Sequence, residues 1–416
     1  WISGLAGAAV MVGGLLLLLP QALDRAGSIA ARVTIWRASL RLLWPRLWLG
    51  YGADTLELHF PSVYPPELVY YQGRGIAVDR AHNWLLDWSL NYGIVATGLF
   101  ILLVALVVRN GWRQLTTTEA GGEGPPIDQD PAHSWLTACL AALCAQLAGN
   151  LFLFDVAATA VVFWLLLAIV TATTTRRDAD VSSLSSGHSL PAWGRRAVMV
   201  ASVFVLGWIV WQGSVRPLRA DLQSWRGTQA LSRGDTLAAL THYTASVQLQ
   251  PQRAAYHVAG ALTAAQLGHY DRAYRAMDAA IALRPTDPVL YTHLAAIYGR
   301  AAAGAPERVA PAYRAYERAI SLAPTIALTY QQYADLALRS GDGALALALA
   351  QQAVDLDATD AISFGIMGWA YLQAGNLPAA LKAFEQASKW QPASAEYHLG
   401  LATVYFKQGD LAAARR

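Results

Sequence analysis

The first half of the chain contains five segments that are almost free of charge and close to the length of a membrane-spanning helix. They cover residues 1–19, 84–108, 135–154, 156–174 and 197–214, and Asp87 is the one charged residue inside them. The 416-residue chain is 55% hydrophobic and 14% charged, whereas soluble domains carry about 25% charged residues. Because a bilayer core requires about 20 apolar residues per helix, the sequence predicts an all-α, polytopic membrane domain.

Arginines in the loops predict the topology of these spans. Loop 175–196 contains four arginines, and positive residues near spans favour the cytoplasm. Loop 20–83 and everything after residue 214 are then extracytoplasmic. Loop 20–83 opposes this by charge alone, since it holds seven arginines against five acids. That loop is slightly longer than the range in which the rule is strong, so we keep the extracytoplasmic prediction.

Small residues recur with a period of 34 in the second half. Glycines at 234, 268, 341, 375 and 409 are 34, 73, 34 and 34 residues apart, and an alanine follows each of them five positions later. The interval of 73 is 34 plus 39, so one repeat holds five extra residues, which we place at Ala301–Pro306. Prolines at 251, 285, 324 and 392 end four repeats, and Ala358 stands in the equivalent place of another.

Paired helices with this period are typical of tetratricopeptide repeats. Residues 221–416 are therefore predicted to form an α-solenoid with five complete repeats and part of a sixth. The chain begins at Trp1 and ends at Arg416 inside a repeat, so we expect further sequence at both ends and treat the number of spans as a minimum.

Three short sequence elements before the predicted span at residues 84–108 contain candidate functional residues. Arg32 and Trp36 are four positions apart on a predicted helix and share one face. Gly50 and Gly52 predict a tight turn or a close approach of the backbone. His82 lies at the boundary between a polar loop and an apolar span. The candidate residues are Arg32, Trp36, Arg37, Gly50, Gly52, Arg80, His82 and Asn83.

In this order, the elements resemble the family of O-antigen ligases and O-antigen polymerases, which are membrane glycosyltransferases. The family pattern of arginine, three residues and tryptophan is matched by residues 32–36. Gly-x-Gly and a following aromatic residue are matched by residues 50–52 and Phe60, and the His-Asn pair at the start of a span by residues 82–83. A glycine-containing stretch follows at residues 92–99, with Ala96 where the family often has glycine. The resemblance covers roughly residues 1–175.

The resemblance implies transfer of a glycan from a polyprenyl-pyrophosphate carrier to an acceptor hydroxyl, with no metal and no cofactor. His82 would remove or position the acceptor proton, because histidine titrates near neutral pH. Arg32, which occupies the family position, would stabilise the pyrophosphate leaving group. From proximity in sequence we add Arg37 and Arg80 as substrate-binding residues. Asn83 would orient His82 or cap the following helix.

Structural interpretations stand beside these roles. His82 could cap a span at the membrane interface, and several loop arginines could contact lipid headgroups. Asp87, one turn inside a span, could pair with a loop arginine or be hydrated. Cys139 and Cys144 lie five positions apart in one apolar segment and are predicted to be buried thiols, neither a disulfide nor a metal pair.

We therefore predict three parts. Residues 1–175 form the C-terminal part of an O-antigen ligase-like membrane domain with extracytoplasmic loop 20–83. Residues 176–220 form a connector with one further span, and residues 221–416 form the repeat array. The predicted setting is the inner (plasma) membrane, in cell-surface polysaccharide assembly.

The expected partners are a lipid-linked glycan donor, a glycan, lipid or protein acceptor, and a protein or peptide bound by the array. Nucleic acid is not expected, because the net charge is only +3. Two alternatives remain open. One is a membrane-tethered scaffold that organises glycan assembly without catalysis, and the other is a cytoplasmic array that acts as an assembly adaptor.

Overall fold

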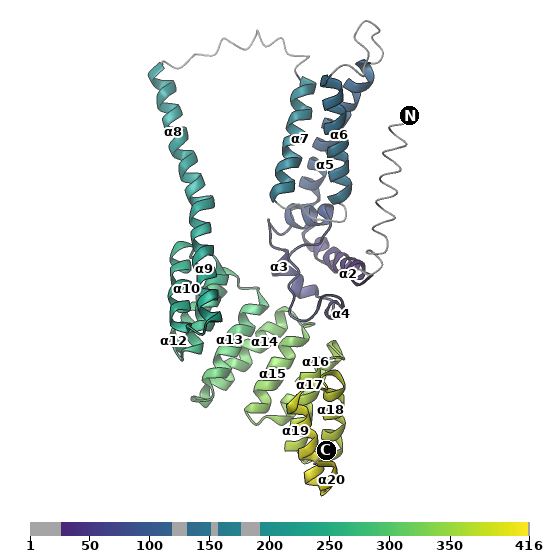
Figure 1. Ribbon diagram of the computed structural model, residues 1–416, viewed down its shortest axis with the longest axis vertical. Helices are drawn as coiled ribbons and strands as arrows, with labels where there is room; N and C mark the ends of the chain where they lie inside the picture. The colour runs from purple at the N-terminus through teal and green to yellow at the C-terminus, as the bar shows by residue number, and fades with distance from the viewer. Residues whose placement is uncertain (1–25, 119–130, 151–156, 176–191, 415–416) are drawn as a thin grey trace. The chain divides into compact units, whose positions relative to one another are not determined.

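A computed structural model describes residues 26–118, 131–150, 157–175 and 192–414, and these ranges contain helices but no strand (Figure 1). The chain divides into two compact units, Trp1–Ser189 and Leu190–Arg416. The predicted all-α class is confirmed for the described ranges. The expected span at 1–19 and the expected turn at Asp155 lie outside them, and the domain boundaries at 175 and 220 stay predictions.

The described part of the first unit begins with a helical segment that builds a small core beside the candidate site. Ile35, Phe60 and Leu68 are fully or almost fully buried there and bring the long helix together with the short ones. The helices of this segment are α2 (Ala26–Leu43), η1 (Trp44–Arg46), α3 (Leu56–His59), η2 (Phe60–Val63) and α4 (Leu68–Gln72).

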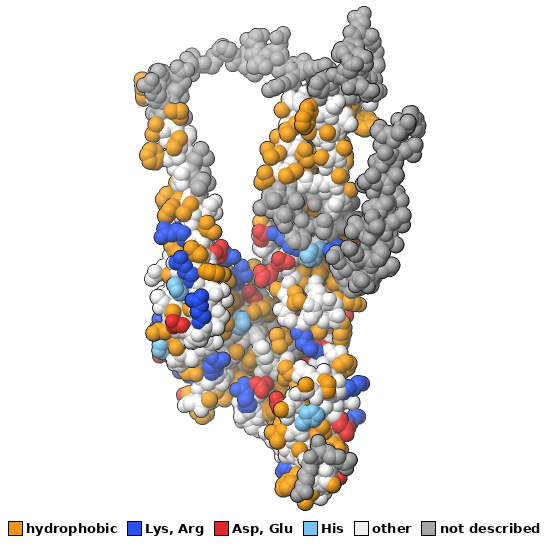
Figure 2. All heavy atoms as spheres, viewed as in Figure 1, with side chains coloured by type: hydrophobic (Ala, Val, Ile, Leu, Met, Phe, Trp, Pro, Cys, Tyr) orange, Lys and Arg blue, Asp and Glu red, His pale blue; other side chains and the backbone are white. Residues whose placement is uncertain are grey.

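The described part of the first unit also contains three longer apolar helices, α5 (Trp84–Thr118), α6 (Pro131–Asn150) and α7 (Ala157–Thr175). They pack on one another, with Phe100, Leu143 and Phe163 in their shared core. Figure 2 shows hydrophobic side chains gathered on the outer surface of this bundle. Such a surface is typical of a protein that faces lipid.

One described helix, Trp84–Thr116, is long and apolar enough to cross a membrane. The apolar stretches in α6 and α7, Ser134–Gly149 and Ala160–Thr174, are shorter, so a multi-pass arrangement stays a prediction. The prediction of two buried thiols was wrong for Cys144, which is exposed, whereas Cys139 is buried. An offset of five residues turns the two side chains to different sides of α6.

The second unit begins with α8 (Ala192–Val210), which continues through a π-helical turn (Trp211–Val215) into α9 (Arg216–Ser232). The apolar segment predicted at 197–214 therefore leads into the first helix of the array without an intervening loop. A π-helical turn adds a residue to the backbone ring and re-aims the helix that follows.

The array consists of helix pairs, as the 34-residue period predicts, and the tetratricopeptide solenoid is confirmed. After α9 come α10 (Thr236–Leu249), α11 (Ala254–Gln266), α12 (Tyr270–Leu283), α13 (Pro288–Ala301), α14 (Val309–Leu322), α15 (Ala327–Arg339), α16 (Gly343–Leu356), α17 (Ala361–Gln373), α18 (Leu377–Trp390), α19 (Ala395–Gln408) and α20 (Leu411–Ala414). The extra residues of the third repeat lie between α13 and α14 and include η6 (Pro306–Arg308).

The recurring glycines end the first helix of five pairs in the left-handed region, with φ between 74° and 85°, whereas α13 ends without one. The next residue often caps the second helix, as when Asp342 accepts a hydrogen bond from the Leu345 amide at 3.0 Å. The alanine five positions after the glycine is fully buried where the helices meet in four of these pairs, for example Ala346, and Ala414 is half-buried.

The prolines of four repeats share a second contact. A ring six residues later bonds the proline carbonyl, as in Tyr291 to Pro285 and Tyr330 to Pro324, both at 3.0 Å. His257 and His398 make the same contact with Pro251 and Pro392.

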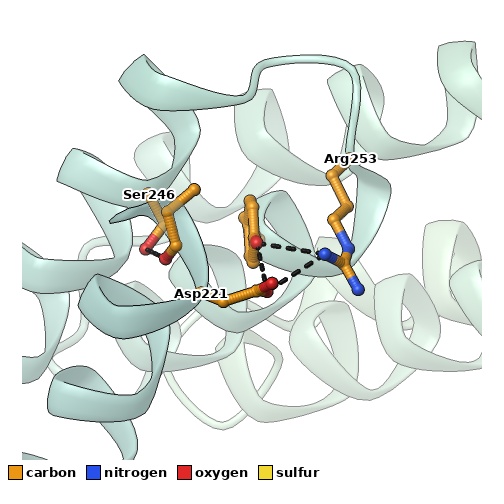
Figure 3. Close-up of polar contacts among 5 residues, drawn as sticks. Asp221, Ser246 and Arg253 are labelled. Atoms are coloured by element: carbon orange, nitrogen blue, oxygen red, sulfur yellow. Dashed lines mark hydrogen bonds and ion pairs between the residues drawn. The ribbon is translucent and has the colours of Figure 1, made fainter. Parts of the chain in front are cut away.

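The first repeat is tied to the second by a polar contact (Figure 3). Asp221 on α9 accepts a hydrogen bond from Tyr256 at 2.6 Å and forms an ion pair with Arg253 at 3.0 Å. Nearby, buried Ser246 donates to the carbonyl of Ala220 at 3.1 Å. These bonds join α9, which continues the apolar α8, to the array that follows.

Candidate active site

The site is framed by a crossing of two backbone segments. Helix α5 is interrupted at Gly93, whose φ of 79° and ψ of 168° are not helical. The segment around residues 47–52 lies against this break. The amides of Tyr51 and Gly52 donate to the carbonyls of Leu90 and Asn91 at 2.7 and 2.9 Å, and the amide of Ile94 donates to the carbonyl of Leu47 at 2.8 Å. The crossing thus supplies hydrogen-bond partners for backbone groups that have none within the interrupted helix.

Glycine is required at the crossing because the two backbones almost touch. A Cβ atom on Gly50 would lie 2.6 Å from the carbonyl oxygen of Leu90, and one on Gly93 would collide with the carbonyl group of Trp48. Gly52 has a φ of 106°, and a Cβ atom there would make only an ordinary contact with the Thr55 side chain at 3.6 Å, so its requirement is conformational. The Gly-x-Gly element therefore shows both features that its spacing predicts, a close approach and an unusual turn.

His82 lies just before α5 in a left-handed conformation, with a φ of 54°. This conformation is uncommon for residues with a side chain and persists where neighbouring contacts fix it. Trp36 donates its indole N–H to the carbonyl of Ala81 at 2.7 Å, and Asp87 accepts from the amide of Ala81 at 2.7 Å. Asn83 caps α5 by accepting from the amide of Leu86 at 3.0 Å.

Burial lowers the pKa of His82 below its ordinary value, and the positive charge of Arg32 lowers that pKa further, whereas Asp79 raises it. Arg32 is half-buried on α2, one turn before Trp36. The structure thus brings Arg32, Trp36 and His82 together, as their shared placement in the motif predicts. Both of these lowering causes favour the neutral form of the imidazole.

The other predicted substrate-binding residues lie in different surroundings. Arg37 is exposed on α2. Arg80 forms an ion pair with Asp54 at 2.7 Å, and Asp54 itself has a left-handed φ of 55°. Asn83 has the capping role that was one of its two predicted roles.

Sequence reasoning missed the contacts of three residues at this site. Asp87 is only 6% exposed, so its carboxyl group is buried although it lies near the start of α5. Gly93 lies within the stretch compared with the family, but nothing in one sequence shows that Trp48 lies against it. Tyr51 donates its hydroxyl to the carbonyl of Leu42 at 2.9 Å, and its ring contacts the His59 ring in a tilted arrangement, with 4.3 Å between ring centres. The position of Tyr51 between two glycines was the sequence feature that could have identified it as a residue of the site.

No group of three or more His, Cys, Asp or Glu side chains among the described residues is placed to hold a metal ion.

Comparisons with known protein families separate the two parts of the chain. Residues 1–101 match the family model described as O-antigen ligase, and residues 367–416 match a tetratricopeptide repeat model. Both resemblances drawn from the sequence are thus confirmed over these residues, and the first match contains Arg32 and His82. The matches indicate a domain of the membrane-associated O-antigen ligase and polymerase type, together with repeats typical of protein-interaction scaffolds. No curated protein matches the chain.

Solved structures that resemble the chain are tetratricopeptide repeat proteins. PilW, a type IV pilus biogenesis factor, is 16% identical over 47% of this chain and 89% of its own, with a TM-score of 0.41. A thermophilic repeat protein from Thermus thermophilus is 21% identical over 45% of this chain and 99% of its own, with a TM-score of 0.38. PilF from Pseudomonas aeruginosa is 16% identical over 49% of this chain and 90% of its own, with a TM-score of 0.41.

Proposed function

We propose that the first unit transfers a glycan from a polyprenyl-pyrophosphate carrier to an acceptor hydroxyl, as a ligase or polymerase of cell-surface polysaccharide. The observation that carries the proposal is His82, held in a left-handed conformation within reach of the charge of Arg32. Both residues lie in the segment that matches the O-antigen ligase family model. The alternative is a scaffold without catalysis, which the repeat array by itself would support.

In the proposed reaction, the acceptor oxygen attacks the anomeric carbon of the donor sugar. The bond from that carbon to the pyrophosphate oxygen breaks, and the lipid pyrophosphate leaves with the electron pair. His82 takes the hydroxyl proton. Arg32 stabilises the charge that develops on the leaving group, because guanidinium is always protonated and donates in a fixed geometry. We propose that these groups suffice without a metal ion.

Replacing Arg32 with alanine tests the enzyme against the scaffold. We expect transfer to fall by about 100-fold or more, with lipid-linked precursor accumulating and the protein present at its normal level. The measurement is surface glycan on gels and lipid-linked precursor by thin-layer chromatography, in a deletion strain that carries the full-length gene. Arg41→Ala is the control, because Arg41 is an exposed arginine on the same helix. Unchanged glycan in Arg32→Ala would favour the scaffold.

The pH dependence of transfer should follow the ionisation of His82. Because burial and Arg32 lower the pKa of His82, the rate should decline at a lower pH than it would with a histidine of ordinary pKa. Arg32→Gln removes one of the two lowering causes, so the declining part of the profile should move to higher pH.

Arg32→Lys is the matched control, because it keeps the charge while losing the bidentate geometry. Its rate should fall without a shift of the profile. The measurement is release of polyprenyl pyrophosphate from membranes between acid and neutral pH. An unshifted profile for Arg32→Gln would contradict the assignment of His82 as the base.

We propose a multi-pass inner-membrane protein with loop 20–83 and the array outside the cytoplasm. Alkaline phosphatase is active only when exported, so its fusion after residue 220 should be active, and fusion of a cytoplasm-dependent fluorescent reporter there should be dark. A fusion within loop 175–196 should give the opposite pair of signals. The reverse pattern at residue 220 would place the array in the cytoplasm, as an assembly adaptor.

A further inference from the structure

The carboxyl group of Asp87 is buried in the first turn of α5, and its two oxygen atoms have different surroundings. Its Oδ1 atom accepts a hydrogen bond from the amide of Ala81 at 2.7 Å. Its Oδ2 atom is buried and has no hydrogen-bond partner among the described residues. A carboxyl group in this position is costly to bury, so packing alone gives no reason for it.

The residue that Asp87 contacts is the one that precedes His82. Ala81 is fully buried, and both polar groups of its backbone are bonded, the amide to Asp87 and the carbonyl to Trp36. The peptide that leads into His82 is therefore fixed from α5 on one side and from α2 on the other. A left-handed φ at a residue with a Cβ atom requires such external fixing.

We propose that Asp87 is a positioning residue for His82, acting through its hydrogen bond to the amide of Ala81. The proposal rests on the proposed function, in which His82 is the base. Asp87 has no direct part in the transfer. Its bond holds the 81–83 turn so that the imidazole is presented in one orientation. A small displacement of a catalytic group lowers the reaction rate strongly. An apolar residue could fill the same space but could not accept from the amide.

Two substitutions separate the bond from the charge. Asp87→Asn keeps an oxygen that accepts from Ala81, although a neutral acceptor forms a weaker bond than a carboxylate. We expect this variant to transfer within roughly tenfold of the wild-type rate. Asp87→Ala removes the acceptor, and we expect a loss of about 100-fold in kcat. The KM for lipid-linked donor and the pH profile should stay as in the wild type, because the charges that shift the pKa of His82 are those of Arg32 and Asp79, which the substitution leaves in place.

The matched control is Ser39→Ala. Ser39 is fully buried on α2, and its hydroxyl has no hydrogen-bond partner among the described residues. Removing it deletes a buried polar group of the same unit without deleting a bond, so transfer should be unaffected. The measurement is the release of polyprenyl pyrophosphate at varied donor concentration by full-length protein, with membrane levels compared on blots.

A second readout does not depend on activity. Diethyl pyrocarbonate modifies accessible neutral imidazoles, and mass spectrometry follows each histidine separately. In the purified full-length protein, Asp87→Ala should raise the modification rate of His82 several-fold relative to exposed His398, whereas Asp87→Asn should leave the ratio close to that of the wild type.

The outcomes separate the two proposals. If Asp87→Asn loses transfer as fully as Asp87→Ala, the charge or the open oxygen acts directly and the positioning role is overturned. If Asp87→Ala transfers normally, the role is also overturned. Should Asp87→Ala fail to accumulate, Asp87→Asn decides, since retained transfer supports the role and lost transfer contradicts it. If His82→Ala itself transfers normally, the proposed function fails, whatever Asp87 does.

Discussion

Replacing His82 with alanine should abolish glycan transfer while leaving the protein in the membrane. Loss of a general base lowers a rate by about 100- to 10,000-fold, which on a gel of surface glycan is a complete loss. Fold stability should change little, because His82 is half-buried and its left-handed conformation is fixed through Ala81 and Asp87. Lipid-linked precursor should accumulate in the same cells, because the donor is still made.

His59→Ala is the matched control for this prediction. His59 lies in the same polar segment, is also half-buried, and has a pKa lowered by burial and by Arg46. Its ring contacts the Tyr51 ring in a tilted arrangement, and it carries no proposed chemical role. We expect its variant to keep surface glycan. If His82→Ala keeps glycan at a normal protein level, or if the two variants behave alike, the assignment of His82 as the base is wrong.

The repeat array could be predicted almost completely, because its signal is periodic and local. The recurring glycines predict left-handed turns, and the alanines predict contacts between two helices. Gly341 and Ala346 show these two roles. The extra residues of the third repeat were also placed correctly, between α13 and α14. The conformation and burial of such residues follow from their neighbours in sequence, so a single sequence is enough to predict them.

The candidate site was only partly predictable, because its contacts join residues far apart in the chain. The i, i+4 spacing places Arg32 and Trp36 on one face, but it does not reveal that the indole bonds the carbonyl of Ala81, which is 45 positions later. The role proposed for Asp87 depends on the backbone turn that precedes α5. Amino-acid composition does not predict a turn that contains a left-handed histidine. An apolar run likewise does not show that α5 is interrupted at Gly93.

The crossing of α5 with residues 47–52 should therefore be the most sensitive point of the first unit to a single added methyl group. Gly93→Ala places a Cβ atom against the carbonyl group of Trp48 and forces alanine into a backbone region that is essentially restricted to glycine. We expect a destabilisation of about 3 kcal/mol or more. In cells, the variant should be nearly absent from the membrane, and in detergent its aggregation temperature should fall sharply.

Gly98→Ala is the control within the same helix. Gly98 has ordinary helical geometry, is exposed, and a Cβ atom there would meet nothing within 4 Å. Alanine is favoured over glycine in a helix by roughly 0.5–1 kcal/mol, so this variant should be as stable as the wild type or slightly more so. Because the two glycines are five positions apart on α5, a difference between their variants isolates the crossing from any general intolerance of the helix. If Gly93→Ala were as stable as Gly98→Ala, the close approach to Trp48 would be refuted, and the framework that holds His82 would have to be rebuilt on other contacts.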